Sequence, residues 1–339
     1  MSERLQRFLR RASSGWRRER AATLPEGHDR FDAPDGAGFV ERVTSRAMWT
    51  RYEEMRRECE DVLAIEYMLG RPRVLEWVHS VGVVQDQVLR SLVPPLPPLE
   101  LRSITADPPL AAFLWTGLVD IQQVVALYER HRRGPVMAHP AVLDFGCGCG
   151  RLSRFLGLRP DRWSASACDV NPAHVRWCQD HLPVVRSHPV GVRPPAPFHD
   201  ATFVLIYALS VFTHLPEDRA GEWIRELARL LVLGGVLVLT THGLPALQTI
   251  ATSLHHQKMF ALTPGDVAQI VEQVRAEIFH YRPYAAEVVR LAQAGEDYGN
   301  AFVHPRYVEA RWASDELELV EHLPGGLRGW QDIAVLRRR

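Results

Sequence analysis

One short segment, residues 142–150, constrains the fold of this chain more than any other. Val142-Leu143-Asp144-Phe145 is a mainly apolar run, and three glycines follow it at alternate positions: Gly146, Gly148 and Gly150. Glycine lets the backbone turn sharply and approach a ligand that a Cβ atom would repel. In open parallel sheets, ligands bind beyond the carboxyl ends of the strands. The segment therefore predicts a buried strand followed by a ligand-binding turn.

The rest of the C-terminal half alternates apolar strands with helical segments. Asn171-Pro172 opens one helix with an N-cap and a proline at the first helical position, and Gly234-Gly235 ends another that starts at Pro216. Further strands are predicted at 163–168, 203–207 and 236–240, and an edge pair joined by Pro324-Gly325-Gly326 at 316–322 and 331–336. This order predicts a Rossmann-like, doubly wound α/β sheet of seven strands, mostly parallel, with an antiparallel edge hairpin.

The N-terminal part has a different character. Residues 1–38 are rich in arginine and predict a basic, poorly ordered arm. Residues 39–135 show helical periodicity, interrupted by the proline-rich connector 94–98 and resumed in a helix over 117–131. This helical region is expected to cap the ligand site or to form a homodimer contact.

Composition excludes several classes of function. Forty basic residues balance forty acidic ones, so no net charge favours nucleic acid as a partner. No run approaches the roughly 18 uninterrupted apolar residues of a membrane span, and no apolar signal core follows the N-terminus. Five cysteines at these spacings predict neither disulfides nor a metal site, which favours a cytoplasmic location. The only lysine, Lys258, lies in no phosphate-binding loop and in no context that supports a pyridoxal Schiff base.

Two acidic residues indicate what the glycine loop holds. Asp144 precedes the first glycine by two residues, and Asp169 ends the next strand, where a carboxylate can accept both hydroxyl hydrogens of a ribose. A dinucleotide site is the competing interpretation, but Arg151 or Ser153 stands where its third glycine belongs. Asp144 would also repel a pyrophosphate, whereas it suits a cationic ligand group. A glycine turn that serves packing alone leaves both acids unexplained.

These residues resemble the class I S-adenosylmethionine-dependent methyltransferases. The segment 144–151 is similar to that family's first motif, and 168–172 resembles its second. The segments 210–215, 234–235, 241–243 and 330–336 resemble a bacterial branch acting mainly on small molecules, so that the likeness covers about 136–339. Two features depart from the family: Val204 replaces an aspartate before the fourth strand, and 186–189 lacks the acidic or amide residue expected near the adenine.

The resemblance implies S-adenosyl-L-methionine as cofactor, with Asp169 on the ribose and Val170 against the adenine. Tyr207 and Ala208 are expected to border the cofactor through backbone and ring edge. The expected cofactor-binding residues are Asp144, Phe145, Gly146, Cys147, Gly148, Gly150, Asp169, Val170, Tyr207 and Ala208. No metal is expected.

Methyl transfer needs a protein base only if the acceptor must lose a proton. His214 follows the fourth strand, and its pKa class suits a base near neutral pH; capping or packing is the alternative role. His242, after the fifth strand, is a second candidate, and His304 and Tyr298 are candidates for a pocket wall.

The segment 244–300 is a long insertion that is expected either to close over the site as a lid or to act as a stabilising flap. Its aromatic candidates for contact with the acceptor are Phe260, Phe279, Tyr281 and Tyr284. The resulting hypothesis is methyl transfer to a small molecule, a secondary metabolite or a sugar, with O-methylation favoured. The alternative is a methyltransferase of protein, lipid or RNA, or a cofactor-binding scaffold, recruited through the N-terminal arm.

Overall fold

A computed structural model describes residues 36–58, 62, 66, 70, 73–105, 109–134, 137–276, 279–284 and 298–339. Most of the expected arm, residues 1–35, lies outside the described residues, as does 285–297 within the insertion. The first described helix, α2 (Gly36–Val43), begins before the expected end of the arm.

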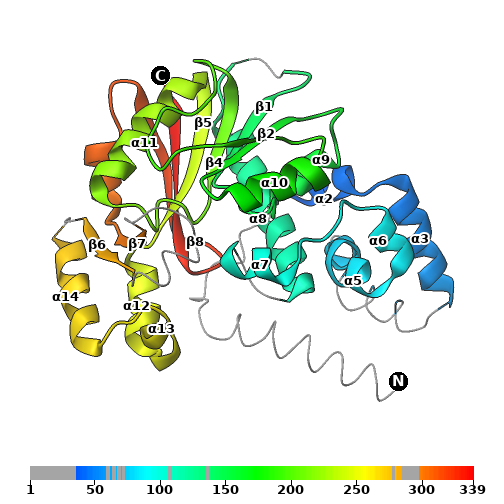
Figure 1. Ribbon diagram of the computed structural model, residues 1–339, viewed down its shortest axis with the longest axis horizontal. Helices are drawn as coiled ribbons and strands as arrows, with labels where there is room; N and C mark the ends of the chain where they lie inside the picture. Colours follow the sequence, from blue (N-terminus) through cyan, green and yellow to red (C-terminus); the bar gives the residue numbers. More distant parts are fainter. Residues whose placement is uncertain are drawn as a thin grey trace.

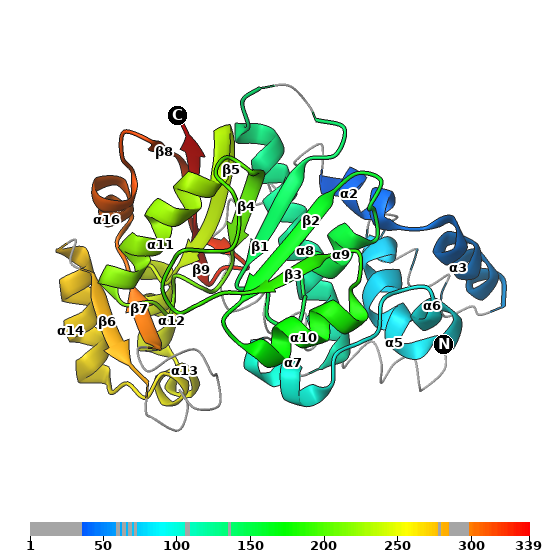
Figure 2. The same cartoon turned by 45° about the horizontal axis from the view of Figure 1, so that its top comes forward.

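A seven-stranded sheet forms the centre of the molecule, with the order β3-β2-β1-β4-β5-β9-β8 (Figure 2). Neighbours from β3 to β5 are parallel, while β9 is antiparallel to both β5 and β8. The strands are β1 (Ala141–Phe145), β2 (Ser164–Asp169), β3 (Arg186–Pro189), β4 (Phe203–Ala208), β5 (Leu231–Thr241), β8 (Leu317–Leu327) and β9 (Gln331–Arg338). The predicted fold class is confirmed. Because the strand order reverses direction between β1 and β4, the glycine loop after β1 lies at the topological switch point, where such sheets bind ligands.

Helices cover both faces of this sheet. Alternate residues of β1 point to opposite faces, Val142 into the core shared with α8 to α10 and Leu143 into the core shared with α11. These helices are α8 (Leu110–His131), α9 (Ser153–Gly157), α10 (Pro172–His181) and α11 (Glu217–Leu230). α10 begins as predicted, since the Asn171 side chain accepts a hydrogen bond from the Ala173 N–H.

The N-terminal helices pack outside α8 and form one end of the molecule, while the insertion forms the opposite end (Figure 1). The N-terminal elements after α2 are α3 (Arg46–Glu58), the π-helix η1 (Val78–Gly82), α5 (Val83–Gln85), α6 (Gln87–Ser91) and α7 (Leu99–Thr105). α8 starts at Leu110, earlier than the predicted start at residue 117. It is long and apolar enough to cross a membrane, with mean hydropathy 1.6, but 56% of that apolar window is buried inside the protein. Its contacts with η1, α2 and β5 are those of a core helix.

Two predicted boundaries were wrong. α11 ends at Leu230, and Leu231 already pairs with Phe203, so Gly234-Gly235 lies within β5 beside a register shift. Leu230 to Val232 are apolar and fit the buried side of a helix or a strand equally well, which is why periodicity did not separate them. Pro324-Gly325-Gly326 likewise lies within β8 at a second register shift, and the turn follows Leu327.

The insertion packs around a core of its own, between α12, α14 and β7. Thr263 and Asp266 form a capping box at the start of α14, as the sequence predicted. Three hydrogen bonds dock its end on the loops after β4 and β5: the Gly299 N–H donates to the His214 carbonyl, the Ala301 N–H donates to the Thr213 carbonyl, and the Val303 N–H donates to the His242 carbonyl. The elements of this part are α12 (Leu244–Thr252), α13 (Leu254–Met259), α14 (Pro264–Arg275), β6 (His280–Pro283), β7 (Gly299–Phe302), α16 (Pro305–Tyr307) and η2 (Val308–Trp312).

Candidate active site

The three glycines of the loop all adopt backbone conformations that other residues avoid. Their φ angles are +77° at Gly146, +53° at Gly148 and +76° at Gly150. A Cβ atom at Gly146 would also overlap the Val211 side chain, and one at Gly150 would overlap Leu182. Backbone conformation therefore accounts for all three glycines, and close packing adds a second reason at two of them, so the evidence for a ligand rests on the acidic residues beside them.

Asp169 ties the end of β2 to the glycine loop. The Gly148 N–H donates to Asp169 Oδ2 at 2.7 Å, and the Asn171 N–H donates to Oδ1 at 2.8 Å. Each carboxylate oxygen keeps a second lone pair that can accept a ribose hydroxyl. The next residue, Val170, is half-buried, as a residue in contact with a base would be.

Asp144 is a buried carboxyl next to this loop. It lies between Ala167 of β2 and Tyr207 of β4 in the sheet register. Burial raises the pKa of Asp144 to about 7, although the Ser153 and Tyr207 hydroxyls and the Arg151 charge oppose the shift. Asp144 Oδ2 is buried and makes no hydrogen bond to any residue that the structure describes. A cationic ligand group near this oxygen would favour the ionised form.

His214 has a defined tautomer. Its Nδ1 lies 2.9 Å from the Gly299 carbonyl oxygen, which only accepts, so Nδ1 carries the proton and Nε2 keeps a lone pair. The Tyr284 hydroxyl lies 3.3 Å from the same Nδ1 and donates to Asn300 Oδ1 at 2.7 Å. Burial lowers the pKa of His214 to about 4, partly offset by the Gly299 carbonyl. The expectation that this residue titrates near neutral pH was wrong, because desolvation disfavours the imidazolium.

Residues 142–235, which span β1, the glycine loop, Asp169 and β4, match the family model of a methyltransferase domain. These residues lie in the seven-stranded sheet described above, in which β9 is antiparallel to its neighbours. Residues 142–235 belong to a methyltransferase domain, and the strand order of the sheet is that of the class I, S-adenosylmethionine-dependent kind. The cofactor of this domain is S-adenosyl-L-methionine, and Asp169, Val170 and Asp144 fit a ribose, a base and a cationic group respectively.

Three solved structures resemble this chain at low sequence identity. A Pyrococcus horikoshii protein shares 14% identity over 70% of this chain and 95% of its own, with TM-score 0.41. An S-adenosylmethionine-dependent methyltransferase of Mesorhizobium loti shares 10% over 66% and 98%, with TM-score 0.41. PKMT2 of Rickettsia typhi, solved with AdoHcy, shares 12% over 62% and 52%, with TM-score 0.42. These likenesses identify no acceptor for the methyltransferase.

Several expected site residues are enclosed in the methyltransferase core. Tyr207 and Ala208 are fully buried, so the ring edge of Tyr207 faces protein instead of an open site. Phe145 packs on Trp223 with ring centroids 4.7 Å apart, and Cys147 is buried with its thiol directed at the Gly148 carbonyl. Contacts between these residues and the cofactor stay a prediction.

His242 lies next to His214 and is packed among aromatic rings. Its ring is buried, 6.3 Å from the His214 ring, and contacts the rings of Phe260, Phe302 and Trp330. Burial lowers the pKa of His242 to about 3, and its Nδ1 has no hydrogen-bond partner within the described part of the chain. This geometry favours His214 over His242 as a group that meets an acceptor.

The remaining candidates divide between site and scaffold. The Tyr298 ring lies 4.7 Å from the His214 ring, so the structure brings it to the site. His304 instead caps α16, because its Nδ1 accepts a hydrogen bond from the Arg306 N–H. Phe260 and Phe279 are buried in core clusters, whereas Tyr281 and Tyr284 are half-buried. Among the described residues, no group of three His, Cys, Asp or Glu side chains is arranged to hold a metal.

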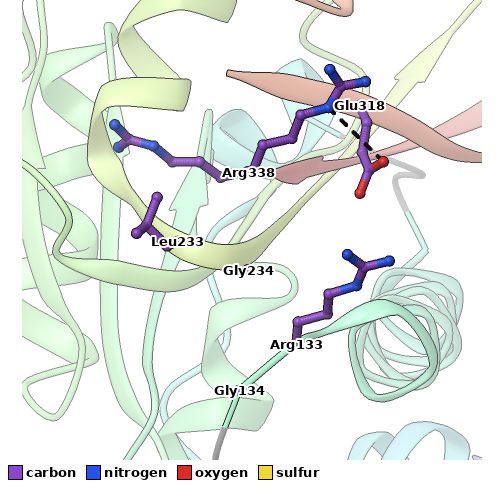
Figure 3. Close-up of a pocket in the computed structure, with 7 residues that line it drawn as sticks. Arg133, Gly134, Leu233, Gly234, Glu318 and Arg338 are labelled. Carbon is purple, nitrogen blue, oxygen red and sulfur yellow. Dashed lines mark ion pairs between the residues drawn. The ribbon is translucent and has the colours of Figure 1, made fainter. Parts of the chain in front are cut away.

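A hollow of about 480 Å³ lies at the opposite ends of the strands from the glycine loop (Figure 3). Arg133, Glu318 and Arg338 line it, and it sits where β5 begins and β9 ends, whereas the glycine loop follows the carboxyl end of β1. One Arg338 guanidinium nitrogen donates to three carbonyls at the end of α11 and the start of β5. This hollow is therefore separate from the cofactor-binding edge.

Proposed function

We propose that this domain transfers a methyl group to a hydroxyl of a small-molecule acceptor, with His214 as general base. The observation that carries the proposal is the His214 tautomer: Nδ1 is committed to the Gly299 carbonyl, so Nε2 is left as the proton acceptor. S-Adenosyl-L-methionine supplies an electrophilic methyl group when it is bound. O-methylation is favoured because a hydroxyl must lose its proton as the new bond forms, whereas many other acceptors need no base.

His214 and its neighbours would move the proton as follows. The neutral imidazole takes the acceptor's hydroxyl proton at Nε2, and the Gly299 carbonyl holds the ring in place through Nδ1. The Tyr284 hydroxyl donates to Asn300 Oδ1 and lies 3.3 Å from Nδ1 of the same imidazole ring. Because its pKa is lowered to about 4, His214 is neutral throughout the physiological range and needs no deprotonation before it acts.

The test compares His214→Asn with His214→Gln. The asparagine amide can replace Nδ1–H as donor to Gly299 but offers no base, whereas glutamine reaches the Nε2 position without basicity. Both variants are expected to lower turnover by about 10²–10⁴-fold on a hydroxylated acceptor, with cofactor affinity nearly unchanged. S-Adenosylhomocysteine release across a panel of hydroxylated metabolites measures turnover, and calorimetry measures affinity. Turnover within a few-fold of wild type would reduce His214 to a packing residue.

A macromolecular acceptor is the second candidate, and the composition of the arm favours it. In the first twenty positions of the arm, residues 1–38, arginines far outnumber acidic residues. Deletion of residues 1–35 discriminates between the two candidates: an enzyme of free metabolites keeps its turnover, while an enzyme recruited to protein, lipid or RNA loses it. A cytoplasmic location, a lid role for 244–300 and a homodimer contact in 39–135 remain parts of this proposal.

A further inference from the structure

A buried carboxylate on α8 contacts the end of the glycine loop from outside the sequence motif. Asp120 is fully buried, and Arg151, the residue after Gly150, reaches its Oδ2 with Nη1 at 2.6 Å. Arg328, in the turn between β8 and β9, places Nε 3.2 Å from Asp120 Oδ1. One carboxylate therefore joins the N-terminal helical region, the glycine loop and the C-terminal hairpin.

The backbone of α8 also approaches the loop closely. A Cβ atom at Gly117, one helical turn before Asp120, would overlap the Arg151 carbonyl oxygen. Residues three apart share a helix face, so Gly117 and Asp120 present one surface to the loop. Arg154 extends this contact, because it donates to the Pro95 carbonyl and stacks 5.7 Å from the Phe113 ring. The start of the helix after the loop is therefore built against α8.

Arg151 stands between two acidic residues with different tasks. Its charge acts on Asp144, the carboxyl assigned to a cationic group of the cofactor, while its ion pair is with Asp120. A guanidinium that turned to Asp144 would compete directly with the cofactor. The charged and titratable groups that act on Asp144 are Arg151, Asp169, Tyr207, Cys147 and Cys168.

We propose that Asp120 is a positioning residue for cofactor binding: it holds Arg151 away from Asp144 and so keeps that carboxylate free for the cationic part of S-adenosyl-L-methionine. Arg328 supports Asp120 from the hairpin turn, where its own backbone is held at φ +56°. The N-terminal region is then part of the cofactor site, in addition to any role as a cap or dimer contact. The inference concerns cofactor binding only and does not depend on the acceptor or on His214.

The experiment measures S-adenosylhomocysteine affinity by calorimetry, well below each variant's melting temperature. Asp120→Asn keeps the side-chain shape but releases Arg151, which can then pair with Asp144. Affinity is expected to fall about tenfold, which corresponds to about 1.4 kcal/mol. The double variant Asp120→Asn with Arg151→Gln leaves no free guanidinium and is expected to bind within about threefold of wild type. This rescue separates the proposal from a merely structural role, in which the double variant would be no better than the single one.

Two further measurements keep the proposal falsifiable. Glu226→Gln on α11 breaks a partly exposed pair, Glu226–Arg229, on the other face of the sheet, and is expected to lower Tm without changing affinity. Asp120→Asn is also expected to abolish proton release on cofactor binding near pH 7, because Arg151 would already hold Asp144 ionised. Wild-type affinity in Asp120→Asn, or a double variant that binds as weakly as the single, would overturn the proposal. If Asp120→Asn fails to fold, the double variant is compared with Arg151→Gln alone: without the guanidinium, loss of the Asp120 charge should not change affinity, and weaker binding by the double variant would overturn the proposal.

Discussion

The glycine-loop side and the histidine side of the active site are held together by different means. On the glycine-loop side, Asp169 bonds to backbone N–H groups within the same contiguous stretch, residues 144–171. On the histidine side, His214 is placed by Gly299, Tyr284 and Asn300, which lie at least seventy positions away along the chain. The first side is fixed by short-range backbone geometry and the second by docking of the insertion, so the two should respond differently to mutation and to pH.

The largest expected effect is on the glycine-loop side. Gly146→Ala forces a Cβ into Val211 at φ +77°, which combines overpacking with backbone strain, and should destabilise the fold by about 2–5 kcal/mol. Calorimetry of this variant should detect no binding of S-adenosylhomocysteine. The paired variant Gly146→Ala with Val211→Ala removes the overlap but keeps the strain, and should recover part of the stability. No recovery would show that strain alone accounts for the requirement, while wild-type binding in the single variant would contradict the loop geometry.

A smaller loss is expected at Asp169. Asp169→Ala removes the acceptor for the Gly148 and Asn171 N–H groups together with the expected ribose contacts, so affinity should fall at least about tenfold. Asp169→Asn, which retains one acceptor oxygen, serves as the matched variant and should fall between. Neither variant should change the pH profile of a step that depends on His214. Unchanged cofactor affinity in Asp169→Ala would remove this residue from the cofactor site.

The difference between the two sides also explains what sequence reasoning could reach. Asp144, the glycines and Asp169 occupy one contiguous pattern, and local rules place such a pattern at the end of a parallel strand. The Asp120–Arg151 and Arg328 contacts were missed because their partners lie on separate elements and share no motif. The pKa of His214 was misjudged for the same reason, since burial by Tyr284 and Tyr298 is a property of the folded insertion. Boundaries at Leu230 and Leu327 were missed where apolar residues fit two periodicities.

A fall in pH should change the stability contributions of the two sides in opposite directions. Burial lowers the pKa of His214 to about 4 and that of His242 to about 3, below the ordinary value of 6.5. As pH falls through 6.5 the unfolded chain takes up these protons and the native one does not, so the histidine side loses stability. Asp144 behaves oppositely: its pKa of about 7 means that the native state takes up a proton first, and its contribution to stability rises from pH 7 toward 3.8.

Two measurements check this pH dependence. Cofactor binding to ionised Asp144 should weaken by about tenfold from pH 8 to pH 6 and release a proton, which calorimetry in buffers of different ionisation enthalpy detects. Local hydrogen exchange at pH 5 should accelerate in β7 before it does in β1. Asp144→Asn removes the proton release and is the control. Affinity that is flat from pH 8 to pH 6 would separate Asp144 from the cofactor.

The smallest expected effect concerns the insertion itself. The Ala301 and Gly299 N–H groups bond to the carbonyls of Thr213 and His214, so β7 should be protected from exchange even without cofactor. The helices α12 to α14 have a separate core and fewer ties to the sheet, and as parts of a lid they should gain protection, by a few-fold, when cofactor and acceptor are bound. Hydrogen exchange with and without these ligands measures the difference. Equal protection in both states would make the insertion a scaffold that holds His214 in place, because the bonds from β7 to the loop after β4 would then be its whole contribution to catalysis.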